Sequence, residues 1–315
     1  MTVGLPVVSR TYVSWCLDST RWQRFAPRGD EIVVTTPYKS GTTWMIHIVG
    51  HLLFNDLRQR EHSTFGRWID ANFQPVDGDL AALEQMPHRR VMKTHLALDA
   101  LPYDHRLRYI YVGRDLRDIF MSLWNHHTNY TPEMWAKMSD RARDVGVAMA
   151  PPPPDDIHRF WHDWITRSQF EWEPPEGYPY WSTLHHLRTW WEYRHLPNIL
   201  FVHFNDLLAD LPREIARVAS FLGLERGADR YAEIASLSSI SAMRRDGDLI
   251  NPGAHFAFRG GPTTFINRGT NGRWRGVLTD RELAQYDWAM RHLPGDAAAW
   301  LETGQAAARE AEWSI

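Results

Sequence analysis

A lysine and a single glycine stand between a strand-like run and a helix-like run near the start of the chain. The run 32–34 is β-branched, and the apolar stretch 45–53 has helical spacing. A helix start presents unpartnered N–H groups and a positive dipole end, Gly41 allows close approach to the backbone, and Lys39 adds a full charge. The pattern predicts a site for a phosphate-like anion, formed by Lys39, Ser40, Gly41, Thr42, Thr43 and Trp44.

The order of these residues argues against an ATP site. A Walker A loop places its Lys directly after the second of two glycines, and the next hydroxyl residue binds Mg²⁺. Here Lys39 precedes Gly41, and no glycine stands where the first one belongs. A P-loop-type kinase is therefore kept only as an alternative, which would show dependence on ATP and Mg²⁺.

Two further strand-like runs end in residues that could do chemistry. The run 108–112 leads to Arg114, whose guanidinium can bind a phosphate with two donors, and Ser122 follows about two helical turns later. The run 90–93 ends at Lys93, two residues before His95. Histidine is the natural general base for a hydroxyl proton near neutral pH.

Together these motifs resemble the PAPS-dependent (cytosolic-type) sulfotransferase family. The string K-S-G-T-T-W from Lys39 matches the family loop that binds the 5′-phosphosulfate of PAPS, 3′-phosphoadenosine 5′-phosphosulfate. The resemblance implies that Arg114 and Ser122 hold the 3′-phosphate, with Ser122 near Lys39. It also implies that His95 is the catalytic base and that Lys93 helps to bind the phosphosulfate. The expected reaction moves the sulfuryl group of PAPS in line to a hydroxyl of a small alcohol or phenol, without a metal.

A glycine-containing motif near the C-terminus departs from the family pattern R-K-G-x-x-G-D-W-K. Gly269 opens an intact Gly-x-x-Gly-x-Trp frame, but Asn267 stands where the family has its first Arg. Asn267 can donate a hydrogen bond but carries no charge. The candidates to replace that charge are Arg268, Arg273 and Arg275, and we expect weaker PAPS binding rather than none. A non-catalytic PAP- or ligand-binding relative is the second alternative.

Weaker matches concern the adenine. Ser238 and Ile240 lie in a segment similar to the family's T-S-F-x-x-M, and Trp44 is a candidate ring for stacking. Phe204 replaces a Tyr that meets the base in the family. The acceptor is expected to contact segments 65–73, 130–180 and 249–265, whose aromatic residues favour an apolar or aromatic alcohol or phenol. Tryptophan faces would also suit a carbohydrate.

The elements that must position these residues alternate between strands and helices, which predicts an α/β fold with a parallel sheet covered on both faces. The resemblance implies the P-loop-like sulfotransferase fold as a single domain over residues 1–315. We expect strands at 31–36, 90–93, 108–112 and 198–204. We expect helices at 43–57, 116–127, 183–194, 211–222 and 280–293. The Pro- and Trp-rich segment 130–180 is expected to be a lid-like insertion that leaves the core.

The composition sets limits on partners and compartment. A net charge of −3 and a pI of about 6.6 argue against nucleic acid or an anionic membrane as partner. The single Cys16 excludes an intrachain disulfide and favours a reducing, cytoplasmic location. His47 and His51 have a metal-ligand spacing, but no third ligand accompanies them, so we predict no metal site. The oligomeric state is not indicated.

Overall fold

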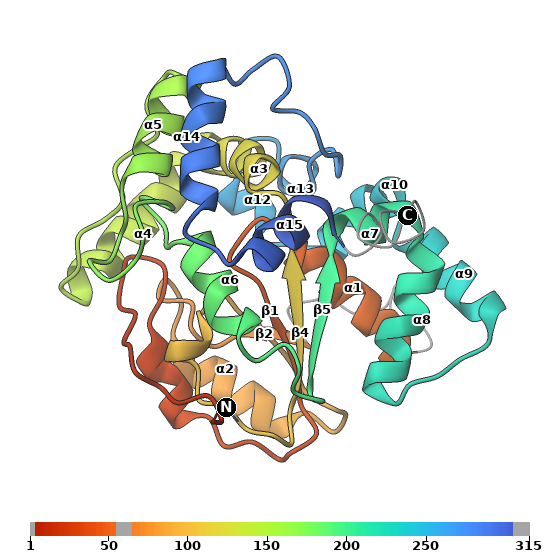
Figure 1. Ribbon diagram of the computed structural model, residues 1–315. Coiled ribbons are helices and arrows are strands. Elements are labelled where there is room, and N and C mark those ends of the chain that lie inside the picture. The colour runs from red at the N-terminus through yellow and green to blue at the C-terminus, as the bar shows by residue number, and fades with distance from the viewer. Residues whose placement is uncertain (1–3, 55–64, 305–315) are drawn as a thin grey trace, which may run out of the picture.

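Five parallel strands form one sheet at the centre of the computed structural model, which describes residues 4–54 and 65–304 (Figure 1). Their order is β2-β3-β1-β4-β5. All the pairings between them are parallel, so their carboxyl ends lie at one edge of the sheet. The strands are β1 (Ile32–Thr35), β2 (Gly66–Trp68), β3 (Val91–Thr94), β4 (Arg108–Gly113) and β5 (Ile199–His203).

Helices connect the strands and cover both faces of the sheet. The longer ones are α1 (Thr42–Leu53), α2 (Val76–Gln85), α3 (Leu116–Thr128), α4 (Pro132–Asp144), α5 (Ile157–Thr166), α6 (Thr183–Trp191), α8 (Leu211–Leu222), α9 (Ala228–Leu237), α14 (Asp280–Met290) and α15 (Gly295–Thr303). Short helices are η1 (Ser19–Arg24), η4 (Leu98–Ala100), α7 (Phe204–Ala209), α10 (Ile240–Arg245), α11 (Gly247–Ile250), α12 (Ala254–Ala257) and α13 (Pro262–Phe265). Within the described ranges, no helix combines the length and the apolar character needed to cross a membrane.

Successive strand residues point to opposite faces and fill two separate cores. Ile110 and Val112 of β4 pack with α1, α8 and α9, on the right of the sheet in Figure 1. Tyr109 and Tyr111 belong to the larger core on the other face, together with residues of α3, α5, α6, α14 and α15. The inner strands β1 and β4 are almost completely buried, as expected for a parallel sheet covered on both sides, whereas the edge strand β2 is half-buried. The predicted α/β class is confirmed.

Several predicted boundaries differ from the structure by a few residues. The helices expected at 183–194 and 280–293 end at Trp191 and Met290, where turns lead toward prolines. The strand expected to reach residue 204 stops at His203, whose side chain accepts from the Asn205 N–H and caps α7. The helix expected to reach residue 57 ends at Leu53, and the last residues of that prediction lie outside the described residues. The analysis missed β2, because a three-residue edge strand with Arg and Gly carries little apolar signal.

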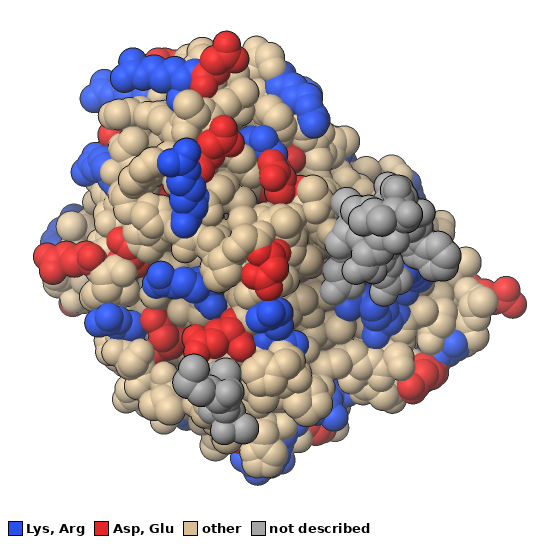
Figure 2. Space-filling view, in the orientation of Figure 1, with Lys and Arg blue, Asp and Glu red and all other residues tan. Residues whose placement is uncertain are grey.

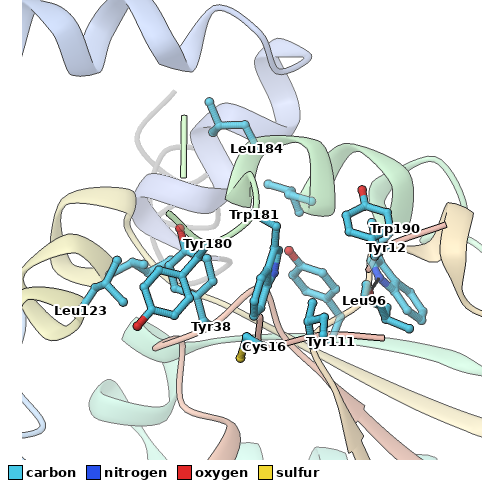
Figure 3. Packing of buried hydrophobic residues seen from close by; sticks show 14 of the residues in the cluster. Tyr12, Cys16, Tyr38, Leu96, Tyr111, Leu123, Tyr180, Trp181, Leu184 and Trp190 are labelled. Atoms are coloured by element: carbon cyan, nitrogen blue, oxygen red, sulfur yellow. Dashed lines mark hydrogen bonds between the residues drawn. The ribbon is translucent and has the colours of Figure 1, made fainter. Parts of the chain in front are cut away.

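The segment 130–180 contains helices α4 and α5 and packs into the larger core. Trp161 and Trp164 are fully buried, and their rings lie 4.8 and 5.2 Å from that of Phe120 on α3. The Trp164 Nε1–H donates to the Tyr38 hydroxyl, 3.0 Å away. Figure 3 shows the Tyr38 ring beside Tyr180 and Trp181. The segment therefore packs against the loop before α1.

Two buried glutamates lie just before α6. Glu176 is fully buried and accepts from the Ser182 hydroxyl at 2.8 Å and the Leu184 N–H at 3.2 Å. Burial raises the pKa of Glu176 to about 7, and burial and the nearby Glu176 raise the pKa of Glu173 to about 9. Both groups therefore favour their protonated forms in the folded protein.

We expect Glu176→Gln to flatten the dependence of stability on pH. Below the ordinary pKa near 4.5 both states are protonated and the contribution to stability is fully present. As the pH rises to about 7, only the unfolded chain loses the proton, so the wild type loses about 1.4 kcal/mol per pH unit from this group. Urea unfolding from pH 5 to 8 measures the slope, with exposed Glu171→Gln as control. Equal slopes for Glu176→Gln and wild type would contradict this reading.

Candidate functional site

The loop between β1 and α1 has two left-handed residues that turn it back over the end of the sheet. Lys39 has φ +52° and Gly41 has φ +111°. A Cβ on Gly41 would lie 3.1 Å from the Phe204 ring, so a side chain there would be both strained and crowded. Gly41 is the N-cap residue of α1, and no described side chain caps this helix. The N–H groups of its first turn therefore remain available to an anion.

The hydroxyl groups of this loop differ in their contacts and burial. Ser40 is buried and donates to the Tyr38 carbonyl at 3.0 Å, so it stabilises the turn. The Thr42 hydroxyl lies 2.6 Å from that of Thr36. Thr43 is half-buried at the start of α1.

His95 follows β3 and contacts the end of the neighbouring strand β1. Its Nδ1 lies 2.8 Å from the Thr36 carbonyl oxygen and 3.1 Å from the Thr36 hydroxyl. A carbonyl can only accept, so Nδ1 carries the proton and Nε2 carries a lone pair. The rings of Trp68 and Trp181 flank the imidazole at 4.9 and 5.8 Å. The ring is thus held in the tautomer that can accept a proton at Nε2.

Burial lowers the pKa of His95 to about 3, and the charges of Lys93 and Lys39 contribute to this shift. The free imidazole is therefore neutral over the whole physiological pH range. An anion that neutralises the two lysines would remove part of the depression and make His95 a stronger base. Lys93 itself is half-buried, with its Nζ 4.9 Å from the centre of the Trp68 ring, and burial lowers its pKa.

Lys39 is surrounded by other cations. Its Nζ lies 2.9 Å from His126 Nδ1 and 5.7 Å from the centre of the Phe265 ring. Burial, and then the charges of Arg114, Arg273 and Lys93, lower the pKa of Lys39 to about 7. This local excess of positive charge, in a chain of net charge −3, is suited to a small polyanion. Figure 2 shows charges of both signs scattered over the face in view.

Arg114 is buried and bonds chiefly to the protein. Its Nε and Nη2 both donate to Asn271 Oδ1, at 2.9 and 2.7 Å, and Nη2 also donates to the Thr270 carbonyl. Its Nη1 donates to the Lys39 carbonyl at 3.1 Å, and the guanidinium stacks over the Phe204 ring at 4.1 Å. One of its five N–H groups is left for a ligand. Two free guanidinium donors were expected from the sequence. The hydrogen bonds that tie Arg114 to the loop at Lys39 and to the C-terminal glycine motif could not be predicted from it.

Ser122 lies half-buried on α3, and its hydroxyl makes no hydrogen bond to the described residues. In the glycine motif, the Gly272 N–H donates to Asp118 Oδ1 at 2.8 Å. Asn267 is half-buried and Arg268 is exposed. Arg273 is half-buried, and its charge lowers the pKa of both Lys39 and Arg114, so it faces the same cluster. Of the three arginines considered as substitutes at Asn267, Arg273 is the one with this evidence for its placement.

Residues predicted to meet an adenine come together on the other side of α1. The Trp44 Nε1–H donates to the Ser238 carbonyl at 2.9 Å, and the Trp44 and Phe204 rings meet edge to face at 5.2 Å. A Cβ on Gly269 would lie 2.8 Å from Ile240, so this glycine lets the loop pass close to α10. The Ser238 hydroxyl is buried and has no hydrogen-bond partner among the residues that the structure describes. These groups offer an aromatic face and a spare hydrogen-bonding group to a flat base.

The analysis did not select two residues that hold His95, namely Thr36 and Asp70. Thr36 directly follows β1, and Asp70 is a lone acid within an otherwise apolar stretch after β2, which is the only signal that either carries. His47 and His51, the two histidines with a metal-ligand spacing, lie in α1, where their Nε2 atoms are 3.2 Å apart. Among the described residues, no three His, Cys, Asp or Glu side chains converge as a metal site.

Comparison with known proteins gives one consistent result. The sulfotransferase domain family model matches residues 29–298. The chain is 31% identical to the glycolipid sulfotransferase of Mycobacterium bovis, over 95% of this chain and 96% of that protein. It is 24% identical to sulfotransferase 1A1 of Rattus norvegicus, over 84% of each chain. A mouse sulfotransferase crystallised with PAP shares the fold, with TM-score 0.66 and 19% identity over 90% of this chain and 91% of that one.

We expect Arg273→Gln to weaken PAP binding about tenfold to hundredfold, because a charge-assisted hydrogen bond contributes about 1.5–3 kcal/mol. Calorimetric titration with PAP measures the change. Arg275→Gln is the matched control, since Arg275 is exposed and stacks on Trp274 at 4.7 Å. Equal losses in the two variants would show that Arg273 acts only through general charge.

We expect PAP binding to take up about one proton at pH 8 and almost none at pH 6. With a pKa of about 7, Lys39 is mostly neutral at pH 8 in the free protein, and the incoming negative charge raises that pKa. At pH 6 the lysine is already protonated. Calorimetry in two buffers of different ionisation enthalpy gives the proton count. Lys39→Gln should abolish the uptake and exposed Lys137→Gln should retain it; uptake that persists in Lys39→Gln would assign the proton to another group.

Proposed function

This chain belongs to the sulfotransferase domain family and is a PAPS-dependent sulfotransferase, and we propose that its acceptor is a hydroxyl group of a lipid-linked molecule such as a glycolipid. The observation that carries transfer to a hydroxyl group is the state of His95. Its Nδ1–H donates to the Thr36 carbonyl, so its Nε2 is free to accept a hydroxyl proton beside Lys39 and Lys93. This is a general base placed next to an anion site.

The residues present fit PAPS. The open start of α1 and the cations Lys39 and Lys93 suit the 5′-phosphosulfate. Arg273, the remaining donor of Arg114 and the free hydroxyl of Ser122 are the groups proposed for the 3′-phosphate. Trp44, the buried Ser238 hydroxyl, Ile240 and the loop at Gly269 are proposed to hold the adenine. Asn267 and exposed Arg268 are proposed to flank the 3′-phosphate from the glycine motif.

The chemistry assigned to the chain's own residues is proton removal and charge stabilisation. PAPS, when bound, supplies an activated sulfuryl group whose leaving group is a phosphate. His95 Nε2 accepts the proton of the acceptor hydroxyl, while the Thr36 carbonyl stabilises the imidazolium through Nδ1–H. Lys39 offsets the negative charge that develops on the departing oxygen, and Lys93 neutralises charge near the base.

Aromatic side chains surround this centre on both sides. Trp68 lies against His95 and contacts Phe73 at 5.2 Å between ring centres. On the other side, His126 contacts Phe258 at 4.7 Å, and Phe265 lies near Lys39. These rings come from the segments 65–73 and 249–265 that were expected to meet the acceptor. Flat apolar walls bind both the faces of sugar rings and acyl chains.

The choice of a glycolipid over a small phenol rests on the relatives. Proteins named glycolipid sulfotransferase match nearly the whole chain at 31% identity, whereas the match to sulfotransferase 1A1 is at 24%. The family assignment removes the kinase alternative. The intact pair of Lys39 and His95 favours an enzyme over a non-catalytic relative.

We expect ³⁵S transfer from labelled PAPS to a glycosylated lipid at a rate at least tenfold above that for 2-naphthol or free glucose. His95→Ala should lose about 10²–10⁴-fold in turnover and keep its affinity for PAP, because the base contributes only to the chemical step. Exposed His105→Ala is the control. Faster transfer to naphthol would replace the glycolipid with a phenol, and equal loss of PAP binding in His95→Ala would remove the base role.

A further inference from the structure

We propose that Asp70 is a positioning residue that fixes the backbone of His95, and that the N-terminal turn η1 completes this arrangement by holding the loop that carries Asp70. The inference rests on the proposed role of His95 as the base. It concerns a carboxylate that does not itself reach the reacting atoms but determines where the imidazole lies.

Asp70 is fully buried and accepts three hydrogen bonds from two segments of the chain. Its Oδ2 accepts from the His95 backbone N–H at 3.3 Å and from the Thr94 hydroxyl at 3.2 Å. Its Oδ1 accepts from the Trp22 Nε1–H at 3.1 Å. The Thr94 hydroxyl in turn accepts from the Leu96 N–H at 3.1 Å. The carboxylate thus bonds Thr94 and His95 directly, and the Thr94 hydroxyl links it to Leu96, the next residue of the turn that presents the base.

The imidazole is therefore anchored at both ends. Asp70 holds its backbone, and the Thr36 carbonyl holds its Nδ1, so the direction of Nε2 is set by residues on two strands that flank β3. Fixed hydrogen bonds of this kind reduce the freedom of a base and place it within reach of its proton.

Asp70 has no ion-pair partner among the described residues, which makes it a costly group to bury. Burial raises its pKa to about 6, so it is still ionised at neutral pH. The charges near it are those of Lys93 and Arg21: burial lowers the pKa of both groups, and the negative charge of Asp70 offsets part of that shift. A buried carboxylate held by neutral donors alone is more readily explained by the geometry it imposes than by stability.

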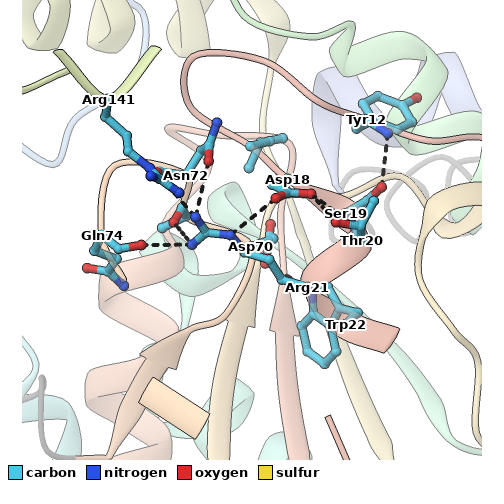
Figure 4. Close-up of polar contacts among 12 residues, drawn as sticks. Tyr12, Asp18, Ser19, Thr20, Arg21, Trp22, Asp70, Asn72, Gln74 and Arg141 are labelled. Carbon is cyan, nitrogen blue, oxygen red and sulfur yellow. Dashed lines mark hydrogen bonds and ion pairs between the residues drawn. The ribbon is translucent and has the colours of Figure 1, made fainter. Parts of the chain in front are cut away.

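Arg21 of η1 holds the loop after β2. Its Nη1 donates to the carbonyls of Ala71 and Gln74, and its Nη2 donates to the carbonyl and Oδ1 of Asn72 (Figure 4). Its Nε donates to Asp18, and the side chain is 4% exposed. Arg141 of α4 also donates to the Asn72 carbonyl at 2.9 Å. The N-terminal turn and α4 therefore fix the two sides of the loop in which Asp70 sits.

The test is Asp70→Asn, which keeps the size of the side chain. Whichever way the amide is oriented, its NH₂ faces a donor, either Trp22 Nε1 or the pair at Thr94 and His95. We expect kcat to fall at least tenfold, with PAP affinity within about twofold of wild type. In ¹⁵N-histidine-labelled Asp70→Asn, the difference between the ¹⁵N chemical shifts of the two His95 ring nitrogens should be smaller than in the wild type. The His95 signals are assigned by their absence in His95→Ala.

Two further variants keep the test decisive. Glu214→Gln changes another buried acid, which pairs with Arg217 on the same helix, α8, so it should keep wild-type kcat. Thr94→Val removes one of the donors to Asp70 and should give an intermediate loss, and it replaces Asp70→Asn if that variant fails to fold.

The possible outcomes distinguish a failure of the role proposed for Asp70 from a failure of the proposed function. A folded Asp70→Asn with wild-type kcat and an unchanged His95 signal would overturn the positioning role. A loss of kcat in Glu214→Gln as large as in Asp70→Asn would also overturn it, since general destabilisation would then explain both. Absence of sulfuryl transfer by the wild type in the same assay would instead count against the proposed function, and the nitrogen shifts would still test Asp70.

Discussion

Repulsion among cations at one edge of the sheet is the constraint on which the rest of this structure depends. Burial, and then the charges of Arg114, Arg273 and Lys93, lower the pKa of Lys39 to about 7. Arg273 also lowers the pKa of Arg114. The protein limits this cost by spreading the four groups over different elements and by tying Arg114 to carbonyl and amide oxygens. What remains is a positive field that a small polyanion neutralises. Binding energy and catalytic readiness are therefore linked, because the same anion that relieves the repulsion also restores the basicity of His95.

The hydrogen bond between His95 and Thr36 joins the fold to the chemistry. It connects the ends of two adjacent parallel strands, so the register of β1 against β3 decides whether the imidazole meets a carbonyl. The pairing of these two strands therefore also selects the tautomer of His95. The rings of Trp68 and Trp181 flank the imidazole, and in the proposed function the aromatic side chains would give the acceptor an apolar surface. The fold and the protonation state of His95 are thus set at the same edge of the sheet.

The sequence analysis found the elements that carry a local signal. The loop at Lys39, the motif at His95 and four of the strands are short contiguous patterns, and the chain positions them as expected. The predictions failed for contacts between residues that are far apart in the sequence. Arg114 donates hydrogen bonds to Asn271, and no local pattern around Asp70 indicates its contacts with Trp22 and Thr94. The segment 130–180 was read from its prolines as leaving the core, whereas its tryptophans pack within it. Such contacts depend on tertiary packing, which periodicity does not contain.

The bond from Arg114 to Asn271 joins residues 157 positions apart and brings the C-terminal glycine motif to the phosphate loop. During synthesis the ribosome makes the loop at Lys39 early, and the motif that closes the nucleotide site leaves the ribosome only after most of the chain. A nascent chain that has completed the sheet would already hold Lys39, Lys93 and Arg114 together without Arg273 or the Thr270 and Asn271 oxygens that bond Arg114. Nucleotide capture would therefore come near the end of synthesis and would act as a late stabilising step rather than as a template for the sheet.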